Sequence, residues 1–264
     1  MARTATVTRN TRETQITLTI DLDGTGRADL HTGIGFFDHM LDGFARHGLF
    51  DVSVTCRGDL DVDCHHTIED IGIALGTAIK EALGDKAGLV RYGSCMLPMD
   101  ETLALCAVDL GGRPYFVYDA SFAGQSCGGM DTQMAREFFY AVSYSAMMNL
   151  HLKVLYGEND HHKLEAMFKA FAKALDAATR RDARIERRFV HQGGRCKGDA
   201  RRRERRAPIV SARGRFPPWT AYTLGGKAVC TRTSSTPSAL WRAQTPSWAR
   251  LCSVSWAASG RTLS

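Results

Sequence analysis

The chain has 264 residues, of which 44% are hydrophobic and 23% charged, the composition of a globular protein rather than of a disordered chain. It contains no run of 18 apolar residues, so no membrane-spanning helix is expected. Residues 1–14 lack the apolar segment of a secretory signal, and the first 186 residues hold no C-x-x-C pair, so we expect a cytoplasmic protein with reduced thiols.

Charge divides the chain into two unlike parts. Residues 1–186 carry 18 basic and 26 acidic side chains, a net charge of −8, whereas residues 187–264 carry 16 basic and 2 acidic ones, a net charge of +14. The second part has few aliphatic residues and no sustained hydrophobic period, which predicts a basic, disordered tail. A shifted reading frame is the favoured origin of this tail, and a nucleic-acid-binding extension is the alternative.

Five elements are predicted in the first half of the acidic part. Apolar residues alternate with polar ones in two strands, a turn at residues 24–26 predicts a hairpin, and two segments have helical periodicity. In chain order these are the strand Gln15–Leu22, its returning strand Arg27–Leu30, the helix Phe36–Arg46, the strand Phe50–Cys56 and the long amphipathic helix His65–Leu83.

The second half predicts the same elements in the same order. A turn at Gly111-Gly112 indicates a second hairpin, and two further helices enclose a strand. The elements are the strands Thr102–Leu110 and Tyr115–Tyr118, the helix Thr132–Met148, the strand Leu150–Leu155 and the helix His161–Thr179.

Shared motifs support a duplication. Phe36-Phe37 in the first half corresponds to Phe138-Phe139 in the second, and both final helices open with H-H-x-x-E. We therefore predict an α+β domain of two similar halves, residues 1–92 and 93–186, each a small antiparallel or mixed sheet covered by two helices, followed by the tail at 187–264.

The H-H-x-x-E motif predicts metal binding. Residues four apart on a helix project about 40° from each other, while neighbours diverge by about 100°. His65 and Glu69 can therefore chelate one ion, whereas His66 points towards another. The second copy repeats this pattern with His161, Glu165 and His162. If the two halves face each other, each spare histidine completes the site of the opposite half.

Two further histidines complete the ligand sets. His39 and His151 are the natural third histidines, and His151 lies on the strand face opposite the core. Gly72 and Gly76 on the first long helix are small enough to let another element approach. Imidazole and carboxylate ligands suit Mn²⁺, Fe²⁺, Co²⁺, Ni²⁺ or Zn²⁺, with six-coordination favouring manganese. Open coordination positions then indicate a bound substrate and Lewis-acid catalysis.

Five motifs in order resemble the imidazoleglycerol-phosphate dehydratase family over residues 3–185. They are G-I-G-F-F-D-H-M-L (Gly33–Leu41), D-C-H-H-T-I-E-D (Asp63–Asp70), M-D-E (Met99–Glu101), G-G-R-P (Gly111–Pro114) and N-D-H-H-K-L-E-A (Asn159–Ala166). The resemblance implies a fold of two similar halves and a hydro-lyase that dehydrates imidazole glycerol phosphate to imidazole acetol phosphate in histidine biosynthesis.

The resemblance also implies two manganese ions per active site. One is held by His39, His66, His161 and Glu165, and the other by His65, Glu69, His151 and His162. In this family the substrate imidazole bridges the two ions as an imidazolate, and the electrons of the ring help to expel the neighbouring hydroxyl. His65, Glu69, His161 and Glu165 are accordingly counted with Glu13 as catalytic.

Substrate contacts follow from the same resemblance. Glu13, in T-R-E-T, matches the substrate-contacting glutamate and is the candidate acid/base. Arg91 and Arg113 match phosphate-contacting positions, and Lys169 places a cation beside the metals. Further substrate-lining residues are His39, Asp38 and His47. The family assembles from trimers into a 24-subunit shell with active sites between subunits, so a homo-oligomer is expected.

The chain departs from the family after residue 186. Family members end with a Ser-Thr-Lys-Gly segment that grips the phosphate, whereas here Glu186 runs into Arg187-Arg188-Phe189. Weak or absent turnover is therefore expected unless that ending is restored, while the metal ligands, all at or before Glu165, are retained.

The sequence leaves three alternative functions, each less well supported than the dehydratase. A binuclear metallohydrolase of phosphate esters prefers more carboxylate ligands than one glutamate per site, and a metal-linked structural or storage oligomer does not need open coordination positions beside cationic residues. Nucleic-acid binding would depend on the tail alone. The favoured partner is a small-molecule phosphate substrate, without a membrane or nucleic acid.

Overall fold

The computed structural model describes residues 3–185, 221–224 and 227–230. It divides into two units, Met1–Gly198 and Asp199–Ser264. In the second unit, β11 (Ala221–Leu224) and β12 (Lys227–Cys230) form a short antiparallel hairpin. The predictions of disorder and of a shifted frame for residues 187–264 otherwise lie outside the described residues. No described helix meets the length and hydropathy that a membrane crossing requires.

The first half forms a four-stranded mixed sheet in the order β1-β2-β4-β3. Only the pair β3–β4 is parallel. Alternate residues of the second strand, Ile16, Leu18 and Ile20, are at most 1% exposed, as the apolar alternation predicts. The elements are β1 (Thr4–Asn10), β2 (Thr14–Asp21), β3 (Ala28–His31), α1 (Gly35–Gly48), β4 (Asp51–Gly58) and α2 (His65–Leu83).

The second half repeats this topology in the order β5-β6-β10-β7, again with a single parallel pair, β7–β10. The predicted α+β class with two similar sheets, each carrying two helices, is confirmed. The elements are β5 (Tyr92–Met99), β6 (Thr102–Asp109), β7 (Tyr115–Asp119), the short pair β8 (Ser126–Cys127) and β9 (Met130–Asp131), α3 (Met134–Ser145), β10 (Asn149–Tyr156) and α4 (Asp160–Thr179).

The predicted hairpins are wrong. β3 does not return along β2, and β7 does not return along β6, because β4 and β10 insert between the members of each pair. β2 and β6 instead form hairpins with β1 and β5, two edge strands that the sequence reading missed. The edge position of β5 explains how it accommodates Pro98, which cannot donate a ladder hydrogen bond.

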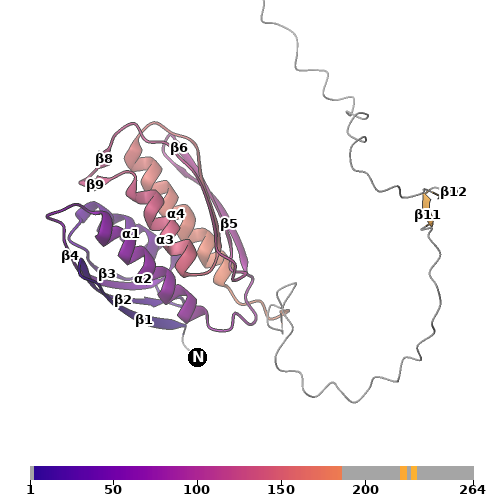
Figure 1. Ribbon diagram of the computed structural model, residues 1–264, viewed down its shortest axis with the longest axis horizontal. Helices are drawn as coiled ribbons and strands as arrows, with labels where there is room; N and C mark the ends of the chain where they lie inside the picture. The colour runs from indigo at the N-terminus through magenta and orange to yellow at the C-terminus, as the bar shows by residue number, and fades with distance from the viewer. Residues whose placement is uncertain (1–2, 186–220, 225–226, 231–264) are drawn as a thin grey trace, which may run out of the picture. The chain divides into compact units, whose positions relative to one another are not determined.

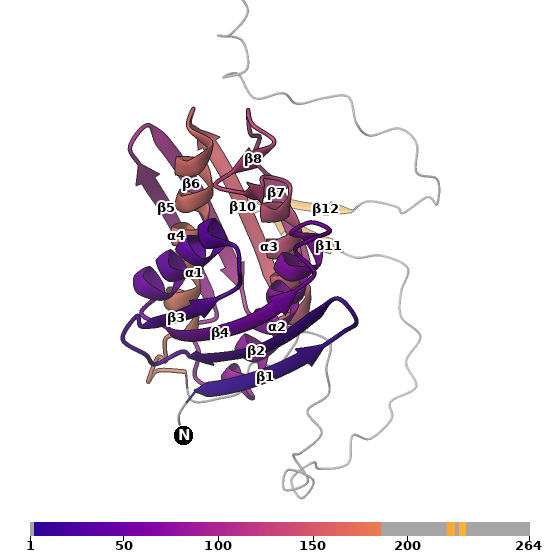
Figure 2. The same ribbon diagram turned by 90° about the vertical axis from the view of Figure 1, so that its left-hand side faces the viewer.

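The four helices lie between the two sheets (Figures 1 and 2). α2 packs on β1 and β2, α4 packs on β5 and β6, and the helices of opposite halves meet as the pairs α2–α3 and α1–α4. Gly72 and Gly76 let α3 approach α2 closely, as the sequence predicts. A Cβ atom at Gly76 would lie 2.6 Å from the carbonyl oxygen of Val142 and 3.0 Å from the amide nitrogen of Ala146.

Replacing Gly76 with valine is expected to destabilise the domain by about 3 kcal/mol, because overpacking here meets backbone atoms that cannot rotate away. Gly43 on α1 is the matched control, since no atom lies within 4 Å of a Cβ placed there. Gly43→Ala should instead stabilise the domain by roughly 0.5–1 kcal/mol through helix propensity. Urea unfolding of both variants measures the difference, and equal stabilities would contradict the close packing.

The outer faces of the two sheets differ in polarity. On the first sheet the outward positions of β1 and β2 are mostly threonines, and Thr6 hydrogen-bonds Thr19 across the strands at 2.9 Å. On the second sheet, outward side chains include Met96, which is 60% exposed, and Tyr115, also 60% exposed. The second face is thus the more apolar of the two.

Candidate metal centre

The opening of α4 is fixed by its cap. The side chain of Asn159 accepts hydrogen bonds from the backbone amides of His161 at 2.9 Å and His162 at 3.3 Å. An N-cap of this kind holds the first turn in place. Because Glu165 follows one turn later, its carboxylate reaches the imidazole of His161, with 3.2 Å between Oε2 and Nε2.

A residue of the first half joins this pair. His39 on α1 places its Nε2 atom 4.0 Å from the same Oε2 atom of Glu165. One ligand atom from each of His39, His161 and Glu165 lies within 4.8 Å of the other two. We call these three residues the histidine–glutamate cluster. Among the described residues it is the one group of three or more such side chains that could hold a metal ion.

Lys169 holds the other oxygen of the glutamate. Its Nζ atom lies 2.7 Å from Oε1 of Glu165, which leaves Oε2 facing the two histidines. Burial would raise the pKa of Glu165, but the hydrogen bond and charge of Lys169, together with His39 and His161, lower it overall. His47, also on α1, is half-buried near these groups, and burial followed by the charge of Lys169 lowers its pKa.

Aromatic packing supports the cluster from the side. The ring of Phe36 meets the ring of His161 edge-on, with centroids 5.1 Å apart. Gly128, in the turn between β8 and β9, lies directly over this ring: a Cβ atom there would be 2.7 Å from Phe36. Its φ of +56° is a second reason for glycine at this position.

The cluster fits a divalent metal ion. Two Nε2 atoms and one carboxylate oxygen converge on one point, and the carboxylate is kept ionised by Lys169. Imidazole nitrogen and hard oxygen are ligands that Mn²⁺ accepts, whereas a thiolate-rich structural zinc site has a different donor set. His66, the fourth ligand implied for this site, lies outside the cluster within one chain.

The two spare histidines are each held by an acidic residue. His162 places Nδ1 2.7 Å from Oε2 of Glu101, in the turn between β5 and β6. His66 places Nδ1 2.9 Å from Oδ2 of Asp59, just after β4. These hydrogen bonds raise the pKa of both histidines. The opposite ring atom of His162, Nε2, lies 3.5 Å from Oδ2 of Asp100, whereas the described ion pairs of His66 involve Nδ1 alone.

The opening of α2 carries the second chelating pair. The backbone amide of His65 donates to Asp63 at 2.7 Å, and its Nε2 atom lies 3.6 Å from Oε2 of Glu69. This pair repeats the geometry of His161 and Glu165. No third ligand from the described part of the same chain joins it.

The turn that carries Glu13 is fastened to α2. Asp70, which is only 8% exposed, accepts from Arg9 at 2.7 Å and from the hydroxyl of Thr14 at 2.5 Å. Glu13 itself is exposed between β1 and β2, close enough for its charge to raise the pKa of His66. Glu13 and the α2 histidines therefore lie at one end of the first sheet.

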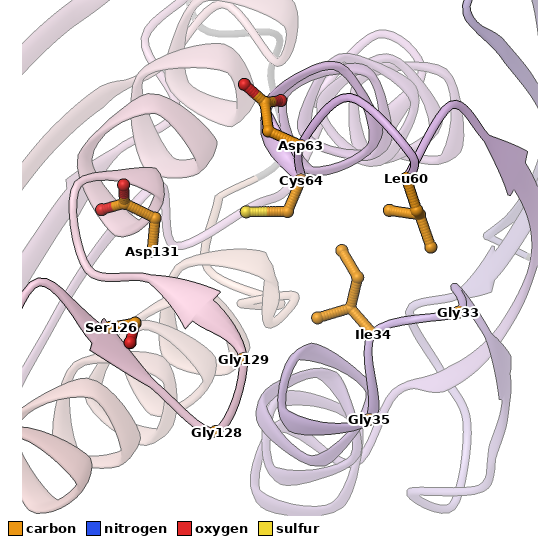
Figure 3. A pocket seen from close by; sticks show the side chains of 10 residues that line it. All are labelled: Gly33, Ile34, Gly35, Leu60, Asp63, Cys64, Ser126, Gly128, Gly129 and Asp131. Atoms are coloured by element: carbon orange, nitrogen blue, oxygen red, sulfur yellow. The ribbon is translucent and has the colours of Figure 1, made fainter.

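A hollow of about 470 Å³ separates the openings of α1 and α2. Figure 3 shows Asp63 and Cys64 above the hollow, Ile34 and Gly35 below it, and the β8–β9 segment at the left, across from Leu60. Nearby, Asp38 has a structural partner: its carboxylate accepts from the hydroxyl of Thr32 at 2.6 Å.

Three other predicted site residues lie at the end of the second sheet opposite to Glu101 and His162. Thr102, next to Glu101, begins β6, and Asp109 ends it about 24 Å away at ~3.4 Å per residue. Arg91 pairs with Asp109 at 2.6 Å. Arg113 lies exposed in the turn after β6, and His151 is in register with Ala107, two residues before Asp109. The second sheet thus has two ends: we call the end at the β5–β6 turn, residues 100–101, the tip end, and the end at Asp109 the far end.

The structure thus gathers one group and separates the rest. One group forms around the histidine–glutamate cluster and consists of His39, His161, Glu165, Lys169 and His47. A second group lies at one end of the first sheet and consists of His65, Glu69, His66 and Glu13. A third group lies at the far end of the second sheet and consists of Arg91, Arg113 and His151. Sequence reasoning missed Glu101, Asp59 and Asp70 as partners. Glu101 and Asp70 lie within the motifs M-D-E and D-C-H-H-T-I-E-D, but spacing alone does not show which side chains they meet.

Known proteins resemble this chain over its first unit. The family profile described as imidazoleglycerol-phosphate dehydratase matches residues 32–175. A curated imidazoleglycerol-phosphate dehydratase of Lachnoclostridium phytofermentans is 60% identical over 186 residues, which cover 70% of this chain and 95% of that protein. One from Acetivibrio thermocellus is 57% identical with the same coverage.

Solved structures agree with these relatives. The crystal structure of imidazoleglycerol-phosphate dehydratase from Staphylococcus aureus matches with a TM-score of 0.62 and 38% identity, over 68% of this chain and 99% of that one. The enzyme from Pyrococcus furiosus, solved in complex with (S)-C348, matches with a TM-score of 0.60 and 35% identity, over 69% and 97%.

Proposed function

Because the chain belongs to the imidazoleglycerol-phosphate dehydratase family, we propose that it dehydrates imidazole glycerol phosphate to imidazole acetol phosphate in histidine biosynthesis, using two manganese ions per active site. The observation that carries this proposal is the convergence of His39, His161 and Glu165 on one point. The location of the protein in the cytoplasm stays a prediction.

The ligand sets follow the two kinds of histidine. The histidine–glutamate cluster would hold one ion, joined by His66, while His65 and Glu69 would hold the other with His151 and His162. The chelating histidines direct Nε2 towards their glutamate, and the spare histidines use Nδ1 for an acidic partner. When bound, the ions supply Lewis acidity that favours loss of the substrate's ring proton.

The chain's own groups bind the substrate and move its carbon-bound proton. Glu13 is exposed on a turn that Asp70 holds against α2, so its carboxylate can remove a proton close to the α2 ligands. Lys169 keeps Glu165 ionised, and the guanidinium groups of Arg91 and Arg113 suit the oxygens of the phosphate.

One chain alone does not supply a complete site. The far-end residues Arg91, Arg113 and His151 are separated from the tip end by about the length of β6, roughly 24 Å. His151 is exposed on the outer face of the second sheet, flanked in register by Ala107 and Val117. We therefore propose that a second copy of the chain brings its far end to the tip end of the first.

The polarity of the sheets supports assembly through that face. The outer face of the second sheet exposes Tyr92, Met96 and Tyr115, which a further copy can cover, whereas the first sheet presents threonines. A closed homo-oligomer, such as the 24-subunit shell of trimers that the family resemblance implies, would both complete the site and cover the apolar face. The two halves, residues 1–92 and 93–186, are proposed to derive from one ancestral unit because their strand orders are the same.

Dehydration by two forms of the chain tests the function. We expect Mn²⁺-dependent formation of imidazole acetol phosphate by the chain in which Ser-Thr-Lys-Gly follows Glu186, and turnover at least about tenfold lower in the chain as it stands. One hydrogen bond to a charged group contributes about 1.5–3 kcal/mol, which corresponds to roughly 10–150-fold. Equal turnover of both forms would show that the altered ending is harmless.

His65→Ala in the restored chain is the accompanying variant. It removes one chelating histidine and should abolish the Mn²⁺-dependent activity, whereas His31→Ala removes an exposed histidine that pairs only with Asp29 in the described contacts and should leave it unchanged. Unaltered activity of His65→Ala would refute the proposed metal sites.

A further inference from the structure

Glu101 uses its two oxygens for two tasks. Oε1 accepts hydrogen bonds from the backbone amides of Asn159 at 2.8 Å and Glu158 at 3.1 Å, and from the hydroxyl of Thr102 at 3.1 Å. Oε2 meets Nδ1 of His162 at 2.7 Å. One carboxylate therefore fastens both the segment before α4 and the histidine on its first turn.

These contacts determine which ring nitrogen of His162 carries the proton. Oε1 of Glu101 accepts three hydrogen bonds, from the amides of Asn159 and Glu158 and from the hydroxyl of Thr102, so the carboxylate acts as an acceptor. Nδ1 of His162 must then donate. Nε2 lies 3.5 Å from Oδ2 of Asp100, beyond hydrogen-bond length, so the shorter contact at Nδ1 decides the tautomer. In the neutral imidazole, Nε2 then keeps a lone pair, the form that a metal ion requires.

Asp59 does the same for His66 in the first half. Its Oδ2 atom lies 2.9 Å from Nδ1 of His66, so the proton is again placed on Nδ1 and the lone pair on Nε2. The chelating histidines differ, because His65 and His161 turn Nε2 towards Glu69 and Glu165. Both spare histidines, and neither chelating one, have an acidic partner on Nδ1 in the described contacts.

The two halves reach this result from different backbone positions. Asp21 of β2 pairs with the first residue of β4, and Asp109 of β6 pairs with the first residue of β10. Counting back along β2 and β6 from these residues places Glu13 and Glu101 at the same position. In the first half the histidine, His66, contacts Asp59 and not Glu13. Glu13 is therefore exposed and available for proton transfer.

We propose that Glu101 and Asp59 are positioning residues, which fix His162 and His66 in the tautomer with Nδ1 protonated so that each Nε2 atom is directed at a metal ion. This role rests on the proposed function, because it assumes that both histidines are ligands. In this proposal both acidic residues act through the histidines and are not themselves metal ligands. Removal of such an outer partner typically weakens metal binding by about 10–100-fold.

Glu101→Gln separates positioning from a purely structural role. The amide oxygen can keep the hydrogen bonds from Asn159 and Glu158, while the amide NH₂ group faces Nδ1 of His162 and donates to it. The proton of the imidazole is then forced onto Nε2. Asp59→Asn makes the same change at His66, and Glu81→Gln, an exposed position late on α2, is the control.

Mn²⁺ titrations of the full chain, followed by the electron paramagnetic resonance signal of free Mn²⁺, give the affinities. We expect Glu101→Gln and Asp59→Asn each to weaken Mn²⁺ binding by about 10–100-fold at unchanged melting temperature, and Glu81→Gln to change it by less than about twofold. Wild-type affinity in a folded Glu101→Gln variant overturns the role of Glu101.

The tautomers provide a readout without metal. Solid-state ¹⁵N nuclear magnetic resonance of the histidine-labelled, metal-free chain should show His162 protonated at Nδ1 in the wild type and at Nε2 in Glu101→Gln, with the signal assigned by its loss in His162→Gln. Protonation at Nε2 in the wild type overturns the inference alone. A wild-type chain that binds no Mn²⁺ overturns the proposed function, and the positioning role with it.

Discussion

Replacing Glu165 with glutamine is expected to weaken Mn²⁺ binding by more than about 100-fold, beyond the loss that an outer partner causes. The carboxylate presents Oε2 to both His39 and His161, and an amide cannot supply the negative charge that offsets a divalent ion. The variant also leaves the ammonium group of Lys169 without its anionic partner, 2.7 Å away, so that a positive charge remains beside the site.

Asp176→Asn is the matched control for Glu165→Gln. Asp176 lies on the same helix and pairs with Arg180 near its end, so its loss should leave the affinity within about twofold of the wild type. Calorimetric titration with Mn²⁺ gives both values. Equal affinities for the wild type and Glu165→Gln would show that the histidine–glutamate cluster does not hold the ion.

Mixing two inactive variants should restore activity. His161→Ala removes a ligand at the tip end of the second sheet, and His151→Ala removes one at the far end. If each active site combines the tip end of one copy with the far end of another, about one quarter of the sites in an evenly mixed assembly contain both histidines. Each variant alone should be inactive, because every one of its sites lacks a ligand.

The assay uses variants that carry the restored ending, co-expressed or dissociated and reassembled together. About a quarter of the wild-type rate is the expected result. A mixture of two tip-end variants, His161→Ala and His39→Ala, is the control and should stay inactive, because the cluster comes from one chain. No recovery with His151→Ala, in assemblies shown to be mixed by mass spectrometry, would contradict sites shared between copies.

Periodicity predicted the elements better than their pairing. The alternation of Ile16, Leu18 and Ile20 determines which face of β2 is buried, and the structure agrees. Strand partners depend on contacts between distant segments, so a turn at residues 24–26 did not reveal that β4 inserts next to β2. β1 and β5 were missed because threonines, a glycine and Pro98 weaken the apolar alternation in edge strands.

Helix geometry predicted the local part of the site. Spacing of four residues pairs His161 with Glu165 and His65 with Glu69, and both pairs are present. The partner of His162, by contrast, is Glu101, 61 residues earlier. Such a contact depends on the tip of one hairpin meeting the start of a helix, which no local pattern encodes.

The unequal polarity of the two outer sheet faces has a consequence for the lone chain. A newly synthesised copy exposes threonines on the first sheet and uncovered tyrosine and methionine side chains on the second. Its resistance to aggregation therefore depends on how quickly it assembles with other copies of the chain. Dilution would then dissociate the oligomer by mass action and expose the tyrosine and methionine side chains before any loss of secondary structure.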